Sequence, residues 1–155
     1  MQAGTSALSV TADGAWTLRI DQQVDVPLVE PAWASMRAPG TSRLATGSFY
    51  RIDQAGIGRV DIYRLTAGDY AMRLTGFYVS PNVDLQIRLS PLPSPRSTHA
   101  YLRAPSAFVA PLDITAGSLN FRVPRTVDPS KYRSVVIWCP LINSAYAAAT
   151  LSFGR

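Results

Sequence analysis

The sequence predicts an all-β fold, a single antiparallel β-sandwich or flattened barrel of roughly 8–11 strands. Short segments alternate between apolar and polar residues, and turns that contain glycine separate them. The 155 residues include 12 Pro and 10 Gly, spread through the chain. No segment longer than about ten residues keeps a helical period, so little helix is expected.

Period-two alternation marks the individual strands. In residues 84–90 (DLQIRLS), the leucines and the isoleucine share one face, and Asp84, Gln86 and Arg88 share the other. The segments GRVDIYRL, YAMRLTG and LNFRV repeat the pattern, with inner residues Val60, Ile62, Met72, Leu74, Leu119, Phe121 and Val123. This pattern is typical of half-buried antiparallel strands.

Three glycines are placed as if in hairpin turns. Gly68 and Gly117 each lie between two alternating runs, and Asp13–Gly14 lies within a third pair. Each position predicts a hairpin. One strand differs, because SVVIWC (134–139) is apolar throughout and should lie centrally with both faces covered. Since successive side chains point to opposite faces, Trp138 and Cys139 should not share one.

Prolines suggest the domain organisation. Residues 1–46 are interpreted as an N-terminal arm that can form a β-hairpin, and residues 47–155 as the β domain. Residues 90–105 carry four prolines and predict one long loop. Loops of this length inside a small sandwich are often functional.

Charge argues against nucleic acid as a partner. The net charge is +5, carried by 14 Arg and one Lys, but the arginines are dispersed along the strands. Arg59, Arg73, Arg88 and Arg122 lie between apolar neighbours, as on a solvated sheet face. No apolar run approaches the ~18 residues of a membrane helix, so a membrane is expected only through an anchor outside this chain.

No motif for hydrolysis, group transfer or structural metal is visible. The chain has no G-x-S-x-G and no phosphate-binding loop followed by a helix. One Cys and one His cannot make a zinc site, so no metal is predicted. The lone Cys139 also gives no internal disulfide.

From Gly47 to Phe153, the order of features resembles the DM-thirteen domain family. YRSVVIWC followed by AATL is the most specific part, and DLQIRLS is the second. The resemblance implies a β-sandwich related to haem-binding DOMON domains, outside the cytoplasm and often anchored to a membrane. It also implies a redox role, in which Cys139 matches the cysteine of the WC motif.

The chain departs from the family pattern at three places. Asn82 and Val83 stand where a Gly-Pro commonly precedes the DL strand, and Pro140 follows the cysteine directly. The histidine usual before the second strand is absent from IDQAGIGRV, which weakens a cofactor mechanism that depends on it.

Cys139 is the redox candidate, and two interpretations of it stay open. A reactive thiol needs access and an electropositive setting, whereas free cysteine is also among the most buried residue types. The Pro-rich loop offers the binding candidates Arg96, His99, Tyr101 and Arg103. A haem would need an axial His or Met, such as His99, Met36 or Met72. Met72 is in phase with core residues and His99 is a single loop residue, so we predict no bound cofactor.

Two functions follow from these observations. The first is a redox-accessory domain outside the cytoplasm that exchanges electrons with an unidentified protein or small molecule. The alternative is a non-catalytic cell-surface binding or adhesion module, which meets its partner through the loop 90–105.

Overall fold

The structure is a computed structural model that describes residues 11, 13–15 and 27–154. Its strands are β1 Leu28–Val29, β2 Ser42–Arg51, β3 Gly56–Arg64, β4 Tyr70–Val79, β5 Gln86–Ser90, β6 Ala107–Pro111, β7 Ala116–Arg122, β8 Ser134–Cys139, β9 Ser144–Thr150 and β10 Ser152–Phe153. The described residues contain one short helix, α1 Thr98–Tyr101, and two 3-10 turns, η1 Ala34–Arg37 and η2 Pro129–Lys131. The prediction of a β fold with little helix is confirmed. In these ranges, no helix has the length and apolar character to cross a membrane.

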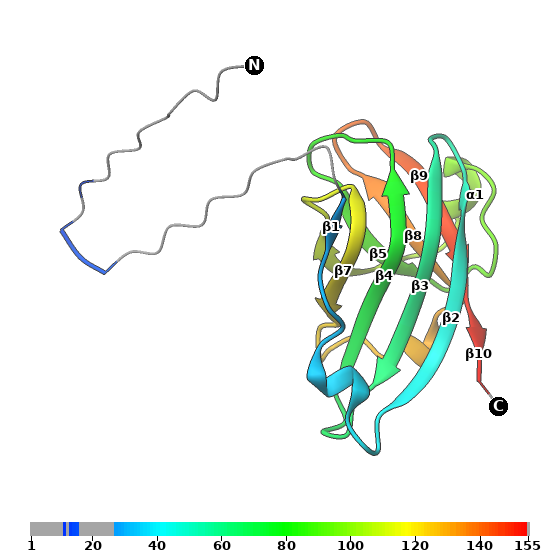
Figure 1. The fold of residues 1–155 in the computed structure, drawn as a ribbon. Coiled ribbons are helices and arrows are strands. Elements are labelled where there is room, and N and C mark those ends of the chain that lie inside the picture. Colours follow the sequence, from blue (N-terminus) through cyan, green and yellow to red (C-terminus); the bar gives the residue numbers. More distant parts are fainter. Residues whose placement is uncertain (1–10, 12, 16–26, 155) are drawn as a thin grey trace.

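All ten strands belong to one sheet. Nine follow one another in the order β1-β7-β4-β3-β2-β9-β8-β5-β6, and β10 pairs with β2 beside that path. The sheet curls strongly into a half-barrel, with β7, β4 and β3 in one layer and β9, β8 and β5 in the other (Figure 1). The pairings are antiparallel except for β1 with β7, which is parallel.

Strand β2 joins the two layers. Its residues up to Ser48 pair with β3, and residues 49–51 pair with β9. Gly47 lies at the crossing, where a Cβ would be 2.4 Å from the carbonyl oxygen of Thr150. Glycine is therefore needed for the end of β9 to approach β2 this closely.

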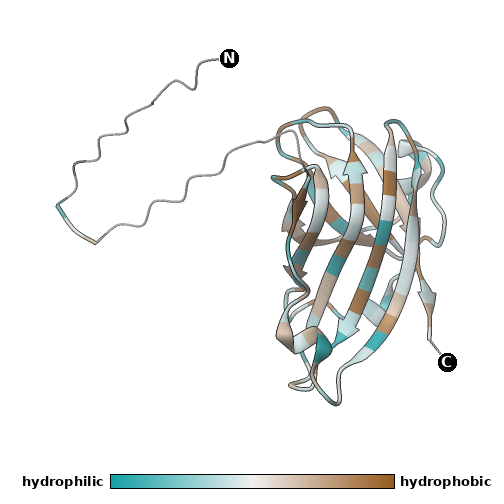
Figure 2. Cartoon of the chain, viewed as in Figure 1, coloured by the Kyte–Doolittle hydropathy of each residue, from teal (hydrophilic) through white to brown (hydrophobic). Residues whose placement is uncertain are grey.

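The predicted register of the strands is confirmed in the core. Leu85, Ile87 and Leu89 are 2%, 0% and 0% exposed and share one hydrophobic cluster. The other predicted inner residues join that cluster, with Phe121 only partly buried. Figure 2 shows the alternation of hydrophilic and hydrophobic residues along the front strands. All six residues of β8 are buried, and β8 lies between β9 and β5, as predicted.

One predicted hairpin is confirmed and one is wrong. Gly68, with φ +85°, turns the chain between the paired strands β3 and β4. Gly117 is not in a turn, because it lies inside β7, while the preceding β6 pairs with β5 at the other end of the sheet path. A Cβ on Gly117 would be 1.9 Å from the carbonyl oxygen of Leu28. This glycine marks the close approach of β1, a role that glycine also takes within strands.

The chain before residue 47 contributes to the fold. The boundary drawn between residues 46 and 47 falls inside β2, because Ser42 onward already pairs with β3. Residues 28–29 pair with β7, and Met36 of η1 packs against Leu65 and Ala71 on the outer face of the sheet. The hairpin predicted around Asp13–Gly14 requires residues outside the described ranges.

The arginines predicted to be solvated hold specific partners. Arg59 and Arg43 are each 54% exposed and both pair with Asp61, which is 1% exposed. Arg73 donates to Asn120 Oδ1 (2.7 Å) and to the carbonyl oxygen of Glu30 (2.9 Å), which ties the segment after β1 to the sheet.

The register of β5 leads to a matched test. Ile87→Ala removes a fully buried side chain and should lower the free energy of unfolding by about 2–5 kcal/mol. Ile57→Ala makes the same chemical change at a residue that is 60% exposed and should cost less than about 0.5 kcal/mol. Urea denaturation followed by circular dichroism measures both. Equal costs would show that the assigned register is wrong.

Candidate functional site

Trp138 and Cys139 end strand β8 and point to opposite sides of the sheet, as predicted from strand alternation. Cys139 is 0% exposed and belongs to the main core cluster. Trp138 belongs to a separate outer cluster with Tyr101, Val136, Ala145 and Ala148. The two residues of the WC motif therefore lie in different environments.

A surface loop contacts the Cys139 thiol. The Sγ atom donates a hydrogen bond to the carbonyl oxygen of Val83 at 3.7 Å, and Val83 itself is 62% exposed. Asn82 holds this loop, since its Nδ2 donates to the buried Tyr146 hydroxyl at 2.6 Å. The Asn82 Oδ1 accepts a hydrogen bond from the Val83 backbone N–H at 2.8 Å. The thiol is thus inaccessible in this conformation but lies directly beneath residues 82–83.

The Pro-rich loop covers the outer face of β8. Tyr101 of α1 is 3% exposed and packs on Trp138 with ring centroids 5.0 Å apart. The Thr98 hydroxyl donates to Asp53 Oδ2 at 2.5 Å and accepts from the Ala145 backbone N–H at 2.7 Å. These contacts explain why β8 is apolar on both faces, because the loop shields the outer one.

Arg88 fastens the far end of the same loop. Its Nε donates to Ser106 Oγ (2.8 Å), its Nη2 donates to the Ser106 carbonyl oxygen (3.1 Å), and Nη1 donates to Gln86 Oε1 (2.8 Å). The Tyr101 hydroxyl lies 2.6 Å from Ser106 Oγ. Burial raises the pKa of Tyr101 above its ordinary value, although the Ser106 hydrogen bond and the Arg88 charge oppose that rise.

The other loop candidates are not brought together. Arg96 is exposed and lies over the Tyr50 ring, 4.0 Å from its centroid, while Tyr50 donates to the Pro95 carbonyl oxygen. His99 is exposed within α1, and Arg103 is exposed in the turn that follows the helix. Of the four predicted binding residues, Tyr101 alone lines a hollow of the surface described below.

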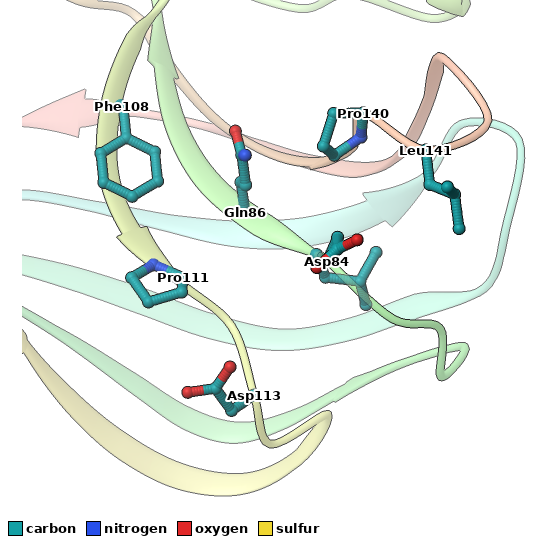
Figure 3. Close-up of a pocket in the computed structure, with 8 residues that line it drawn as sticks. Asp84, Gln86, Phe108, Pro111, Asp113, Pro140 and Leu141 are labelled. Atoms are coloured by element: carbon teal, nitrogen blue, oxygen red, sulfur yellow. The ribbon is translucent and has the colours of Figure 1, made fainter.

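Two hollows lie on the outer side of β5. The first, here called the acidic hollow, has a volume of about 480 Å3 and is lined by Asp84, Leu85, Gln86, Phe108, Pro111, Asp113, Pro140 and Leu141 (Figure 3). The second, here called the aromatic hollow, has a volume of about 310 Å3 and is lined by Arg88, Tyr101, Leu102, Ala104, Pro105, Ser106 and Trp138. The hydrogen bond between Arg88 and Gln86 links the walls of the two.

The haem-ligand candidates do not converge on one site. Met72 is buried between the layers, Met36 lies under η1 on the outer face of the β3–β4 layer, and His99 is exposed on the Pro-rich loop. These residues do not fit two axial ligands of a single haem. Within the described residues, no group of three or more His, Cys, Asp or Glu is placed to hold a metal ion.

Sequence reasoning missed the acidic hollow. Phe108, Leu141 and Ile142 are large apolar residues that are 44%, 61% and 53% exposed. A signal was present in the sequence, because Leu141 and Ile142 follow Cys139-Pro140 in the turn that ends β8. Asp84 and Asp113 join them only through the pairing of β5 with β6.

Comparison with known families gives one match. The family model described as "Electron transfer DM13" matches residues 48–151, which is more than half of the chain. No curated protein and no solved structure matches the chain.

The raised pKa of Tyr101 predicts its behaviour in alkali. The folded state keeps the phenol neutral above its ordinary pKa of 10.0, whereas the unfolded state ionises there. The contribution of Tyr101 to the free energy of unfolding is therefore fully present below pH 10. It is lost as the pH rises through the pKa of the folded state. In an ultraviolet titration, Tyr101→Phe should remove a tyrosine component that ionises above pH 10. Loss of a component that ionises at or below pH 10 would contradict the raised pKa of Tyr101.

Proposed function

The chain belongs to the electron-transfer DM13 family, and from this membership we propose that it is a redox-accessory domain that acts outside the cytoplasm. In this proposal, Cys139 exchanges electrons with the disulfide of a partner. The resemblance of the WC block to the family pattern supports the location outside the cytoplasm. It also supports attachment to a membrane through an anchor. The observation that carries the proposal is the contact of the thiol with Val83, a residue of an exposed surface loop that Asn82 holds to Tyr146.

The proposed reaction is a thiol–disulfide exchange. Opening of the loop lets the Cys139 thiol release its proton to water, and the thiolate attacks one sulfur of the partner disulfide. A bond forms between Cys139 and that sulfur, and the second sulfur leaves as a thiolate with the electron pair of the broken bond. Cys139 is oxidised and the departing sulfur is reduced.

Cys139 is protected until this opening occurs. With 0% exposure, it has no contact with a reagent in the closed state, and the thiolate is the reacting form. Its hydrogen bond to Val83 is a single weak one, so we expect the cost of opening to depend mainly on the hydrogen bond from Asn82 to Tyr146. Local opening of a surface loop needs far less free energy than global unfolding.

The test is the rate at which a thiol reagent labels native protein. The wild-type chain should label slowly when folded and rapidly in denaturant. Asn82→Ala should accelerate native labelling about tenfold, because it removes the side-chain hydrogen bond that holds the loop to Tyr146. Tyr146→Phe should act in the same direction, since it removes the acceptor of the Asn82 side chain.

Val29→Ala is the matched control, because it trims an exposed valine side chain on β1 and leaves residues 82–83 unchanged. Its labelling rate should equal that of the wild-type chain. Low urea concentrations should hardly change the rates, which separates loop opening from global unfolding. Incubation with oxidised glutathione should give a mixed disulfide at Cys139. This disulfide should form faster in Asn82→Ala and Tyr146→Phe than in the wild-type chain. If the Asn82→Ala rate matches the wild-type rate and both rise steeply with urea, the thiol is structural and the redox proposal fails.

The binding module is the second candidate function. It is favoured by the Pro-rich loop, which is fastened at Tyr50, Asp53 and Arg88 while Arg96, His99 and Arg103 remain exposed. A thiol that never exchanges, together with retained binding of a partner through this loop, would support it instead.

A further inference from the structure

We infer that the acidic hollow is a docking site for an extended segment of a partner protein in which a basic and an apolar side chain stand two positions apart. The inference goes beyond the proposed redox function and does not depend on the reactivity of Cys139.

The charge of the hollow sets it apart from the rest of the chain. The protein carries a net charge of +5, yet the hollow is lined by two aspartates, Asp84 and Asp113, and by no basic residue. Both aspartates are exposed, and in the described part of the chain neither forms an ion pair. Two carboxylates without cations on a basic protein are complementary to a lysine or arginine of the partner.

The walls of the hollow are apolar. Phe108 and Pro111 stand on one side and Pro140 and Leu141 on the other, with Gln86 and Asp84 between them (Figure 3). Phe108 and Leu141 are 44% and 61% exposed, and Ile142 continues the apolar surface beyond Leu141. Exposed apolar residues gathered at one place are typical of interaction sites. An apolar side chain of the partner would bury this surface.

The shape of the hollow favours a chain segment over a small molecule. Small-molecule sites usually enclose most of their ligand, whereas wall residues here remain half exposed. The hollow lies beside β6, which ends the strand path and pairs only with β5 among the described strands. An edge strand offers backbone hydrogen bonds to an extended segment, and alternate side chains of that segment would face the hollow.

The test uses the full chain and a short fluorescein-labelled peptide in which every second residue is serine and the positions between alternate between lysine and valine, so that both face the same side. Fluorescence anisotropy should show binding that weakens as salt rises, because the ion pairs are partly exposed. A matched peptide with glutamate in place of lysine should not bind. The double variant Asp84→Asn/Asp113→Asn should bind the lysine peptide about tenfold more weakly, the loss expected for two partly exposed ion pairs. Asparagine at position 84 keeps a residue that tolerates its φ of +58°.

Matched controls separate the hollow from general electrostatics. Asp13→Asn/Asp69→Asn removes the same charge elsewhere and should leave the affinity unchanged. Leu141→Ser should weaken binding, whereas Ile57→Ser, at a residue equally exposed on β3, should not. Cys139→Ser should bind the peptide like the wild-type chain, so this result and the labelling result are independent.

Three outcomes would overturn the inference. These are no binding of the lysine peptide to the wild-type chain, equal binding of the glutamate peptide, and equal weakening by the two double variants.

Discussion

The two-sided burial of strand β8 is the constraint on which the rest of this structure depends. All six residues of Ser134–Cys139 are buried, so each face needs its own apolar cover. The β3–β4 layer covers the inner face, and the Pro-rich loop covers the outer one through Tyr101. Burying each large apolar side chain contributes about 1.5–3 kcal/mol, which is enough to hold a long irregular segment in place.

That constraint explains the composition of the Pro-rich loop. A proline carries no N–H group that would need a partner against the sheet, and it also reduces the entropy lost on folding. Polar anchors complete the cover, since Ser134 Oγ donates to the Leu92 carbonyl oxygen and Tyr50 donates to that of Pro95. The loop singled out as a binding candidate is thus also a structural cover, which is buried at Ser90, Pro95 and Tyr101 and exposed at many of the residues between them.

The sequence predicted what depends on local alternation and missed what depends on distant pairing. The inner faces of β3, β4 and β5 and the split between Trp138 and Cys139 follow from a period of two. Gly117 looks like a turn residue in the sequence, because no local signal shows that Leu28, 89 residues earlier in the chain, pairs with it. Likewise, Asp84 and Asp113 are 29 positions apart and meet only because β5 pairs with β6.

Asn82 shows how a departure from the family pattern changes the closure of the loop over the thiol. The glycine usual at this place has no side chain to reach Tyr146, and a proline in place of Val83 would have no N–H to donate to residue 82. Glycine-proline would shape the loop through its backbone, whereas in this chain one Asn82 side-chain hydrogen bond holds the loop to Tyr146 and a second lies within the loop. Each such bond contributes only about 0.5–1.5 kcal/mol, so closure is reversible at modest cost. In the proposed redox function, Asn82 therefore governs the access of a partner to Cys139, although its side chain carries no redox chemistry.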